Sequence, residues 1–229
     1  MRALRVLLIL AVVLGGIFVG LDRLAVAYAE SEAADRVRLG SARAGSTDVD
    51  IKGFPFLTQV MDKRLDEVEV RLTGVEARAG AKNLRIGELT ATLHDVTLGA
   101  GYTSARARSA TGTALISYAD LAAAADRDVV VAYGGDGKLK VTGQVHVLGR
   151  AITRSVVSSV TLVDGDTIRV RADKVPLEGV PGIEDAIRER TDFDREIGGL
   201  PAGMELERVE AREDGVAVSV TGTDVALAG

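Results

Sequence analysis

The two histidines of the chain are the first side chains to consider for catalysis. His94 is followed directly by Asp95, and a His–Asp pair forms part of the triads that activate a serine nucleophile. Such a triad also needs a serine on a sharp turn, and the sequence has no G-x-S-x-G motif. His94 and His146 both fall in predicted strands, where a histidine is usually a surface or hydrogen-bonded residue. We assign catalysis to neither of them.

Carboxylates offer a second kind of chemistry. Asp136, Asp164 and Asp166 lie in Gly-rich turns and could bind calcium, but the ligand spacing of an EF-hand loop is absent, so they are better explained as turn residues. Asp66 and Glu67 could be the acid and base of a hydrolase, but neighbouring strand residues face opposite sides of a sheet. The sequence therefore predicts no catalytic residue, no metal site and no cofactor, and a protein that is not an enzyme.

An apolar cluster is the third candidate for function. The segment Gly53-Phe54-Pro55-Phe56-Leu57-Thr58-Gln59 holds two of only four phenylalanines in the chain. Pro55 fixes its own φ and keeps Phe54 out of a helical conformation, so both rings project from a rigid, extended segment. The rings are either a plug of the core or the wall or mouth of an apolar ligand cavity. Composition alone favours the plug, because buried aromatic side chains are usually part of a core.

The overall composition excludes several classes of protein. The chain has 229 residues, 47% hydrophobic and 27% charged, which is enough for one domain with a sizeable core. The absence of cysteine excludes a disulfide framework, a thiolate metal site and a Cys nucleophile. The net charge of −5 leaves no basic excess for a phosphate backbone, so we expect no nucleic-acid partner. With 3% aromatics and no tryptophan, the core consists mainly of Val, Leu, Ile and Ala.

Residues 1–27 are predicted to be a signal peptide or an N-terminal membrane anchor. Arg2 and Arg5 precede an uncharged run over 6–21, which as a helix is about 24 Å long against a hydrocarbon core of about 30 Å. The small residues Ala25 and Ala27 are suited to a signal peptidase, so the segment is either cleaved or retained. The leading positive charges predict that the rest of the chain, 28–229, is exported, and because no low-complexity linker divides it, we expect a single domain. Its net charge is −7, because residues 1–27 hold three basic residues and one acidic residue, so any lipid contact must be local and apolar.

The elements that position these residues follow from the hydrophobic pattern. A helix is predicted over 22–38, with Leu24 and Tyr28 near one apolar face, and it continues the anchor if the anchor is retained. Alternation of apolar and polar residues favours strands in most of the remaining chain, and in the clearest of them the apolar positions shift by one residue after Leu65. Short helices are predicted over 57–62, 117–125 and 183–193, the second with Ser117 and Asp120 as a capping box. The strands are predicted over 48–52, 64–75, 84–86, 89–98, 104–116, 129–133, 138–148, 156–163, 167–172, 204–211 and 216–227.

These blocks resemble the signature of the LmeA-like actinobacterial phospholipid-binding proteins over essentially the whole chain. The likeness rests on Gly53 to Gln59 with Arg64-Leu65-Asp66-Glu67-Val68, on Ser117-Tyr118-Ala119-Asp120-Leu121, and on Val141-Thr142-Gly143 with Val147-Leu148-Gly149. The resemblance implies an α+β fold similar to tubular lipid-binding (TULIP-like) domains, in which a strongly curved antiparallel sheet wraps around a long N-terminal helix, here with two short additional helices. It also implies an envelope protein that binds phospholipid, linked in mycobacterial relatives to the maintenance of lipid-anchored mannan.

The hypothesis from sequence is therefore a non-enzymatic lipid-binding protein of the cell envelope, on the outer side of the plasma membrane. Its partners are a phospholipid or other acyl lipid, and the membrane through the N-terminal segment; nothing indicates the oligomeric state. Phe54, Phe56 and Leu57 are expected to line an end of an apolar groove, together with Leu24 and Tyr28 of the helix. The alternative is a structural or interaction module with a packed core and no ligand.

Overall fold

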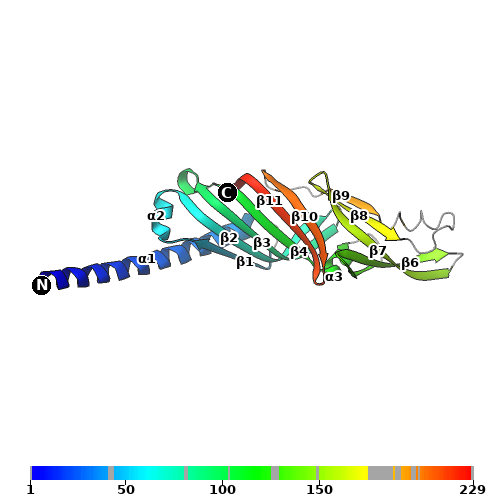
Figure 1. The fold of residues 1–229 in the computed structure, drawn as a ribbon, viewed down its shortest axis with the longest axis horizontal. Helices are drawn as coiled ribbons and strands as arrows, with labels where there is room; N and C mark the ends of the chain where they lie inside the picture. The colour runs from blue at the N-terminus through cyan, green and yellow to red at the C-terminus, as the bar shows by residue number, and fades with distance from the viewer. Residues whose placement is uncertain are drawn as a thin grey trace.

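The computed structural model describes residues 2–40, 44–79, 82–102, 104–124, 129–147, 150–174, 188, 192–196, 200 and 202–227. It begins with one continuous helix, α1 (Arg2–Gly40), which joins the apolar N-terminal run to the helix expected over 22–38. The stretch Leu8–Val37 is long and apolar enough to cross a membrane, and every side chain from 8 to 21 is exposed. The N-terminal half of α1 projects from one end of the molecule (Figure 1).

Two antiparallel sheets form the rest of the fold, which confirms the α+β class with a long N-terminal helix. Neither sheet closes into a barrel. The short helices are α2 (Phe56–Met61) and α3 (Tyr118–Ala124), with a 3-10 turn η1 (Ala100–Tyr102). The six-stranded sheet has the order β1 (Ser46–Lys52), β2 (Arg64–Ala79), β3 (Lys82–Leu98), β4 (Ala105–Ile116), β11 (Gly215–Leu227) and β10 (Met204–Arg212). The five-stranded sheet has the order β5 (Val129–Gly135), β6 (Lys138–Val147), β7 (Arg150–Val163), β8 (Thr167–Lys174) and β9 (Phe193–Glu196).

The second sheet is inserted between two strands of the first. After β4 the chain passes through α3 into β5–β9, and it then returns as the hairpin β10–β11, whose strand β11 pairs with β4. The two sheets follow one another along the long axis of the molecule (Figure 1). They are joined where the Leu206 amide donates to the Gly165 carbonyl at 3.1 Å. A hydrophobic cluster fills this joint, with Ile116, Leu139, Leu206, Val209, Ala211, Val216 and Val218 buried in it.

The six-stranded sheet bends along one row that crosses four strands. Pairing is interrupted at Asp66 of β2, Asp95 of β3, Arg108 of β4 and Asp224 of β11, while the residues on both sides of this row pair in register. Asp95 and Asp224 have φ of 50° and 52°, a left-handed conformation that Asp tolerates better than most residues. The Asp95 carboxylate also receives Arg64 at 3.0 Å and Arg108 at 3.5 Å.

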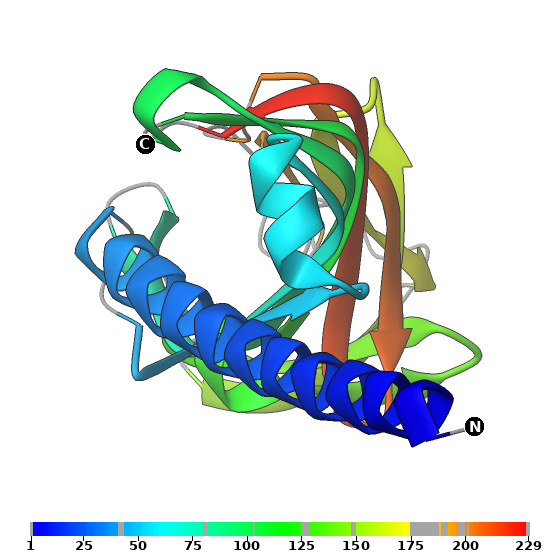
Figure 2. The ribbon, with the colours of Figure 1, turned by 90° about the vertical axis from the view of Figure 1, so that its left-hand side faces the viewer.

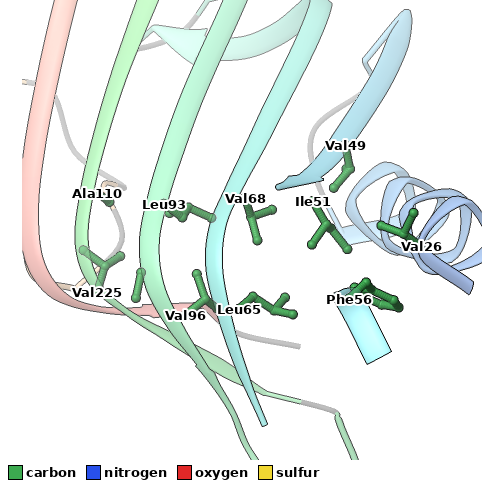
Figure 3. Close-up of a cluster of buried hydrophobic side chains, with 11 residues drawn as sticks. Val26, Val49, Ile51, Phe56, Leu65, Val68, Leu93, Val96, Ala110 and Val225 are labelled. Atoms are coloured by element: carbon green, nitrogen blue, oxygen red, sulfur yellow. The ribbon is translucent and has the colours of Figure 1, made fainter. Parts of the chain in front are cut away.

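This bend changes which residues face inward. In a regular strand every second residue faces inward. Across the bent row, the nearest inward-facing residues of β2, β3, β4 and β11 are instead three positions apart in the sequence. The row Leu65, Val96, Ala107 and Val225 is 6%, 2%, 0% and 0% exposed, and the row Val68, Leu93 and Ala110 is 8%, 8% and 1% exposed. The shift expected after Leu65 is thereby confirmed, and it extends to the neighbouring strands. Both rows line the inner side of the curved sheet (Figure 3).

The predicted strands are confirmed, with the segments over 84–86 and 89–98 joined into the single strand β3. The predicted N-cap at Ser117 is confirmed, because the Asp120 amide donates to Ser117 Oγ at 3.1 Å, and the Asp120 carboxylate accepts a hydrogen bond from the Ser117 hydroxyl at 2.6 Å. The hairpin turns are built from residues with positive φ, including Asp136 and Asp164. The helix predicted over 183–193 lies mostly outside the described residues. Its last residue, Phe193, instead begins β9, because it pairs with Val170 at the otherwise open edge of β8.

The left-handed backbone conformation of Asp95 leads to a first testable prediction. An L-residue with a Cβ but no side-chain hydrogen bond pays about 1–2 kcal/mol in the left-handed region. We expect Asp95→Ala to lower the free energy of unfolding by about that amount, whereas Asp95→Gly, which is free to adopt this φ, should stay close to wild type. Urea unfolding of the full chain in detergent, followed by circular dichroism, measures both. Equal stability of the alanine and wild-type chains would contradict the role of this conformation.

Candidate functional site

The apolar cluster predicted at 53–59 forms a tight turn and the helix α2. Gly53 has φ +97°, and a Cβ there would lie 2.5 Å from Gln59 Nε2 and 3.0 Å from Asp66 Oδ2, so only glycine fits. The Phe54–Pro55 peptide bond is cis. Pro55 occupies the N-cap of α2 in an extended conformation, with φ −77° and ψ 138°, and it offers no side-chain acceptor to the free amides of the helix.

The missing cap comes from α1, 35 residues earlier in the chain. The Leu57 amide donates to Asp22 Oδ1 at 2.8 Å, and the side chain of Asp22 is completely buried. Arg23 Nη2 donates to the other carboxylate oxygen of Asp22 at 2.9 Å, which pairs the buried charge. A carboxylate at a helix N-terminus satisfies an amide that has no partner within the helix and interacts favourably with the helix dipole. α2 is therefore fastened to α1 at the residue that ends the uncharged run.

Arg23 has a second contact at the same place. Its guanidinium carbon lies 5.3 Å from the centroid of the Phe54 ring, within the range of a cation–π interaction. The Phe54 side chain remains 58% exposed. Asp22 and Arg23 together thus hold both the helix α2 and the ring that precedes it.

Gln59 joins α2 to the six-stranded sheet. Its Oε1 accepts the Asp66 amide at 2.9 Å, and its Nε2 donates to the Lys52 carbonyl at 3.3 Å, so the end of β1 and the start of β2 are both fixed. The Lys52 ammonium donates to Asp50 at 2.5 Å and lies 3.4 Å from Glu69. Its hydrogen bond to Asp50, followed by that to Glu69, raises the pKa of Lys52, so this lysine is charged and already paired.

α2 covers one end of the curved sheet (Figure 2). Phe56 is 5% exposed and points toward Ile51 of β1 and Leu65 of β2, while Val26 of α1 faces the same cluster (Figure 3). Leu57 is partly buried against this cluster. In this cluster α1 and α2 pack against the inner rows of the sheet. The side chains that meet there are apolar, and most are branched or small.

The five residues expected to bind lipid are divided between two surfaces. Phe56 and Leu57 belong to the interior cluster, whereas Phe54 is exposed beside Arg23. Leu24 and Tyr28 are 70% and 74% exposed, on the side of α1 that faces away from the cluster. Lipid contact by any of the five stays a prediction.

Sequence reasoning missed the residues of α1 that face the interior. Asp22, Val26, Ala29 and Ala33 recur at helical spacing and lie on one side of α1, and Glu30 Oε1 accepts the Ile51 amide at 2.8 Å. The spacing of the small residues was readable from the sequence. A buried aspartate within that stripe was not, because its partner Leu57 is distant in the chain.

A polar pocket lies between α1 and β1. It has a volume of about 320 Å³ and is lined by Glu30, Ser31, Ala34, Asp35, Thr47, Asp48 and Val49. Three carboxylates in this lining make it unsuitable for an acyl chain. Ala34 and Val49 of this lining also pack in the apolar cluster under α2, so the polar pocket adjoins that cluster.

The histidine considered for catalysis has other partners. His94 Nδ1 lies 3.3 Å from Glu67 Oε2 on the neighbouring strand, while Asp95 pairs with Arg64 and Arg108. His94 and Asp95 therefore do not form the pair that a triad requires. Within the described ranges no group of three His, Asp or Glu side chains is placed to hold a metal ion.

Comparison with known protein families finds a match over most of the chain. A family described as LmeA-like phospholipid-binding matches residues 20–221, from just before Asp22 in α1 to the middle of β11. Neither the curated proteins nor the solved structures searched contain a match.

The contact between Asp22 and α2 makes a second prediction. Loss of a helix N-cap generally costs about 1 kcal/mol. We expect Asp22→Ala to increase hydrogen exchange of the amides of α2 in the full chain, measured by mass spectrometry in detergent, because the Leu57 amide loses its acceptor. Glu32→Ala removes an exposed carboxylate of the same helix, which pairs with Arg36, and should leave α2 unchanged. Unaltered exchange in the Asp22 variant would refute the capping role.

Proposed function

The chain belongs to the LmeA-like phospholipid-binding family, and we propose that it binds phospholipid by enclosing acyl chains in the apolar interior of its curved sheet, without any chemical step. The observation that carries this proposal is the cluster under α2, where one helix and the inner rows of a bent sheet present apolar side chains to one another. Phe54, Phe56 and Leu57 would line the end of this interior.

The residues of the interior fit an acyl chain by size and chemistry. Branched and small side chains leave space that aromatic rings would fill, and Phe56 is the one buried aromatic residue in the described part of this cluster. Each methylene removed from water contributes about 0.8 kcal/mol, so affinity would come mainly from the chains of the lipid. Selectivity for the headgroup would then be modest.

We further propose that α1 is retained as a membrane anchor rather than cleaved. Cleavage after Ala27 would remove Asp22, which caps α2, and Val26, which is 8% exposed in the interior cluster. The part of α1 that packs against the rest of the fold begins at Asp22, five residues before the boundary at 27 suggested by the cleavage pattern. Because Arg2 and Arg5 precede the uncharged run, residues beyond it would lie outside the plasma membrane, in the cell envelope. Support of envelope glycolipid or lipoglycan maintenance is the corresponding biological role.

An envelope module with a packed core and no ligand is the second candidate. It is favoured by the close packing around Phe56, which is only 5% exposed. The two functions differ in what the space between α1 and the sheet contains, since a packed core has no room for a lipid.

A bulky residue on the inner side of α1 separates the two functions. Ala33 packs against the interior cluster, and Ala27 of the same helix is exposed. We expect the wild-type full chain, purified in detergent, to carry phospholipid at a fixed ratio by extraction and mass spectrometry. Ala33→Phe should lose most of this lipid by occupying its space, whereas Ala27→Phe should retain it.

A wild-type chain without lipid, even after incubation with vesicles, would contradict lipid binding. In that case Ala33→Phe should instead destabilise the fold by about 1–3 kcal/mol, the usual effect of overpacking a core.

A further inference from the structure

We propose that the end of the molecule carrying α2 is a membrane-docking surface, seated in the headgroup layer of the same bilayer that α1 spans. The surface consists of Leu24 and Tyr28 of α1, Phe54, and Met61 of α2; we call it the anchor-side surface. This inference rests on the proposed function, since it says from where the bound lipid comes.

The outer side of α1 stays apolar beyond the uncharged run. Leu21, Leu24 and Tyr28 follow one another at helical spacing and are 56%, 70% and 74% exposed. The uncharged run alone is about 24 Å long, but residues 6–24 measure about 28 Å as a helix, close to the hydrocarbon thickness of about 30 Å. Tyr28 then lies at the level where tyrosine is enriched in membrane proteins, between hydrocarbon and water. The apolar side of α1 therefore extends past Asp22.

α2 is held at this same level. The buried Asp22 carboxylate caps α2 and is hidden from the bilayer by it, so the charge that interrupts the apolar run does not face lipid. Met61 is 81% exposed and Phe54 is 58% exposed, although both are large and apolar. Figure 1 places α2 at the end of the sheet from which α1 projects, and Figure 2 shows the helix lying across that end. Isolated exposed apolar residues are ordinary, but Phe54 lies beside Arg23 of α1, and Met61 belongs to the helix that Asp22 of α1 caps.

The charges at this end fit a headgroup layer better than hydrocarbon. Thr58 and Asp62 share the exposed side of α2 with Met61, so the helix cannot sink deeply. Lys63 follows directly, is exposed, and forms no ion pair with any residue that the structure describes, so it is available to a lipid phosphate. The chain as a whole is negative, so attachment depends on the apolar side chains rather than on attraction to anionic lipid.

The continuity of α1 identifies the bilayer as the occupant of this surface. Asp22 follows Leu21 within one unbroken helix, and no linker separates the apolar run from the residue that holds α2. While α1 spans the membrane, α2 cannot move away from it, and a soluble partner has no access to the anchor-side surface. A lipid can then pass from the adjacent leaflet to the cluster behind α2 without crossing water.

The absence of cysteine from the chain permits a direct test. Single cysteines at Met61→Cys, Leu24→Cys and, as a control, Val130→Cys each give one attachment site for a nitroxide. All three side chains are largely exposed, so the substitutions spare the core, and Val130 lies on β5 of the other sheet. The full chain is reconstituted into vesicles of phosphatidylcholine and phosphatidylglycerol. Collision of each nitroxide with oxygen and with a water-soluble nickel chelate is then measured by power saturation.

We expect the chelate to reach positions 24 and 61 about tenfold less than position 130, because a polar complex is excluded from the interface. Chelate access at 61 equal to that at 130 would overturn the docking surface, whether or not lipid is bound. Bound lipid is measured separately by extraction from the same preparations. Lipid without protection at 61 refutes only the docking surface, and protection at 61 without lipid supports docking and refutes only the proposed function.

Discussion

One buried carboxylate determines how the parts of this protein meet. Asp22 ends the uncharged part of α1, and its side chain caps a helix formed 35 residues later. Its burial is tolerated because the Leu57 amide and Arg23 supply hydrogen bonds to both oxygens. The same contact fixes α2 over the end of the curved sheet, so the position of the apolar interior is tied to the helix that can cross a membrane.

The interior itself depends on a bend that is made mainly by aspartates. Asp95 and Asp224 adopt left-handed conformations in one row, and this turns the adjacent row, which includes Val96 and Val225, inward. Within β2, Gly74 also has a positive φ and adds a further kink. Without the bend the end of the sheet would be flat, and α2 would have no concave surface to cover. The bend of the sheet and the position of α2 over its end therefore depend on each other.

The proposed binding of lipid and the proposed docking to the bilayer both depend on this arrangement. An acyl chain held by apolar contact gains affinity without directional bonds, and so a protein of this kind needs to be brought close to membrane lipid rather than to recognise it in water. Membership of a phospholipid-binding family and an apolar N-terminal helix are consistent with that requirement. The second sheet, joined through the cluster around Leu206, extends the molecule away from the projecting half of α1 (Figure 1).

The sequence by itself determined most of the described secondary structure, the α+β class and the family, because alternation, turn residues and the block around Phe54 are local signals. It also indicated that the alternation of inward and outward residues shifts after Leu65, since such a shift can be read from the hydrophobic pattern of a single strand. It did not predict β9, because Phe193 is placed by its pairing with the distant Val170. Only the tertiary structure decided that Asp22 is buried and that Leu24 and Tyr28 face outward. These outcomes depend on contacts between residues distant in the chain, and the hydrophobic pattern of one helix does not say which of its sides a later segment will cover.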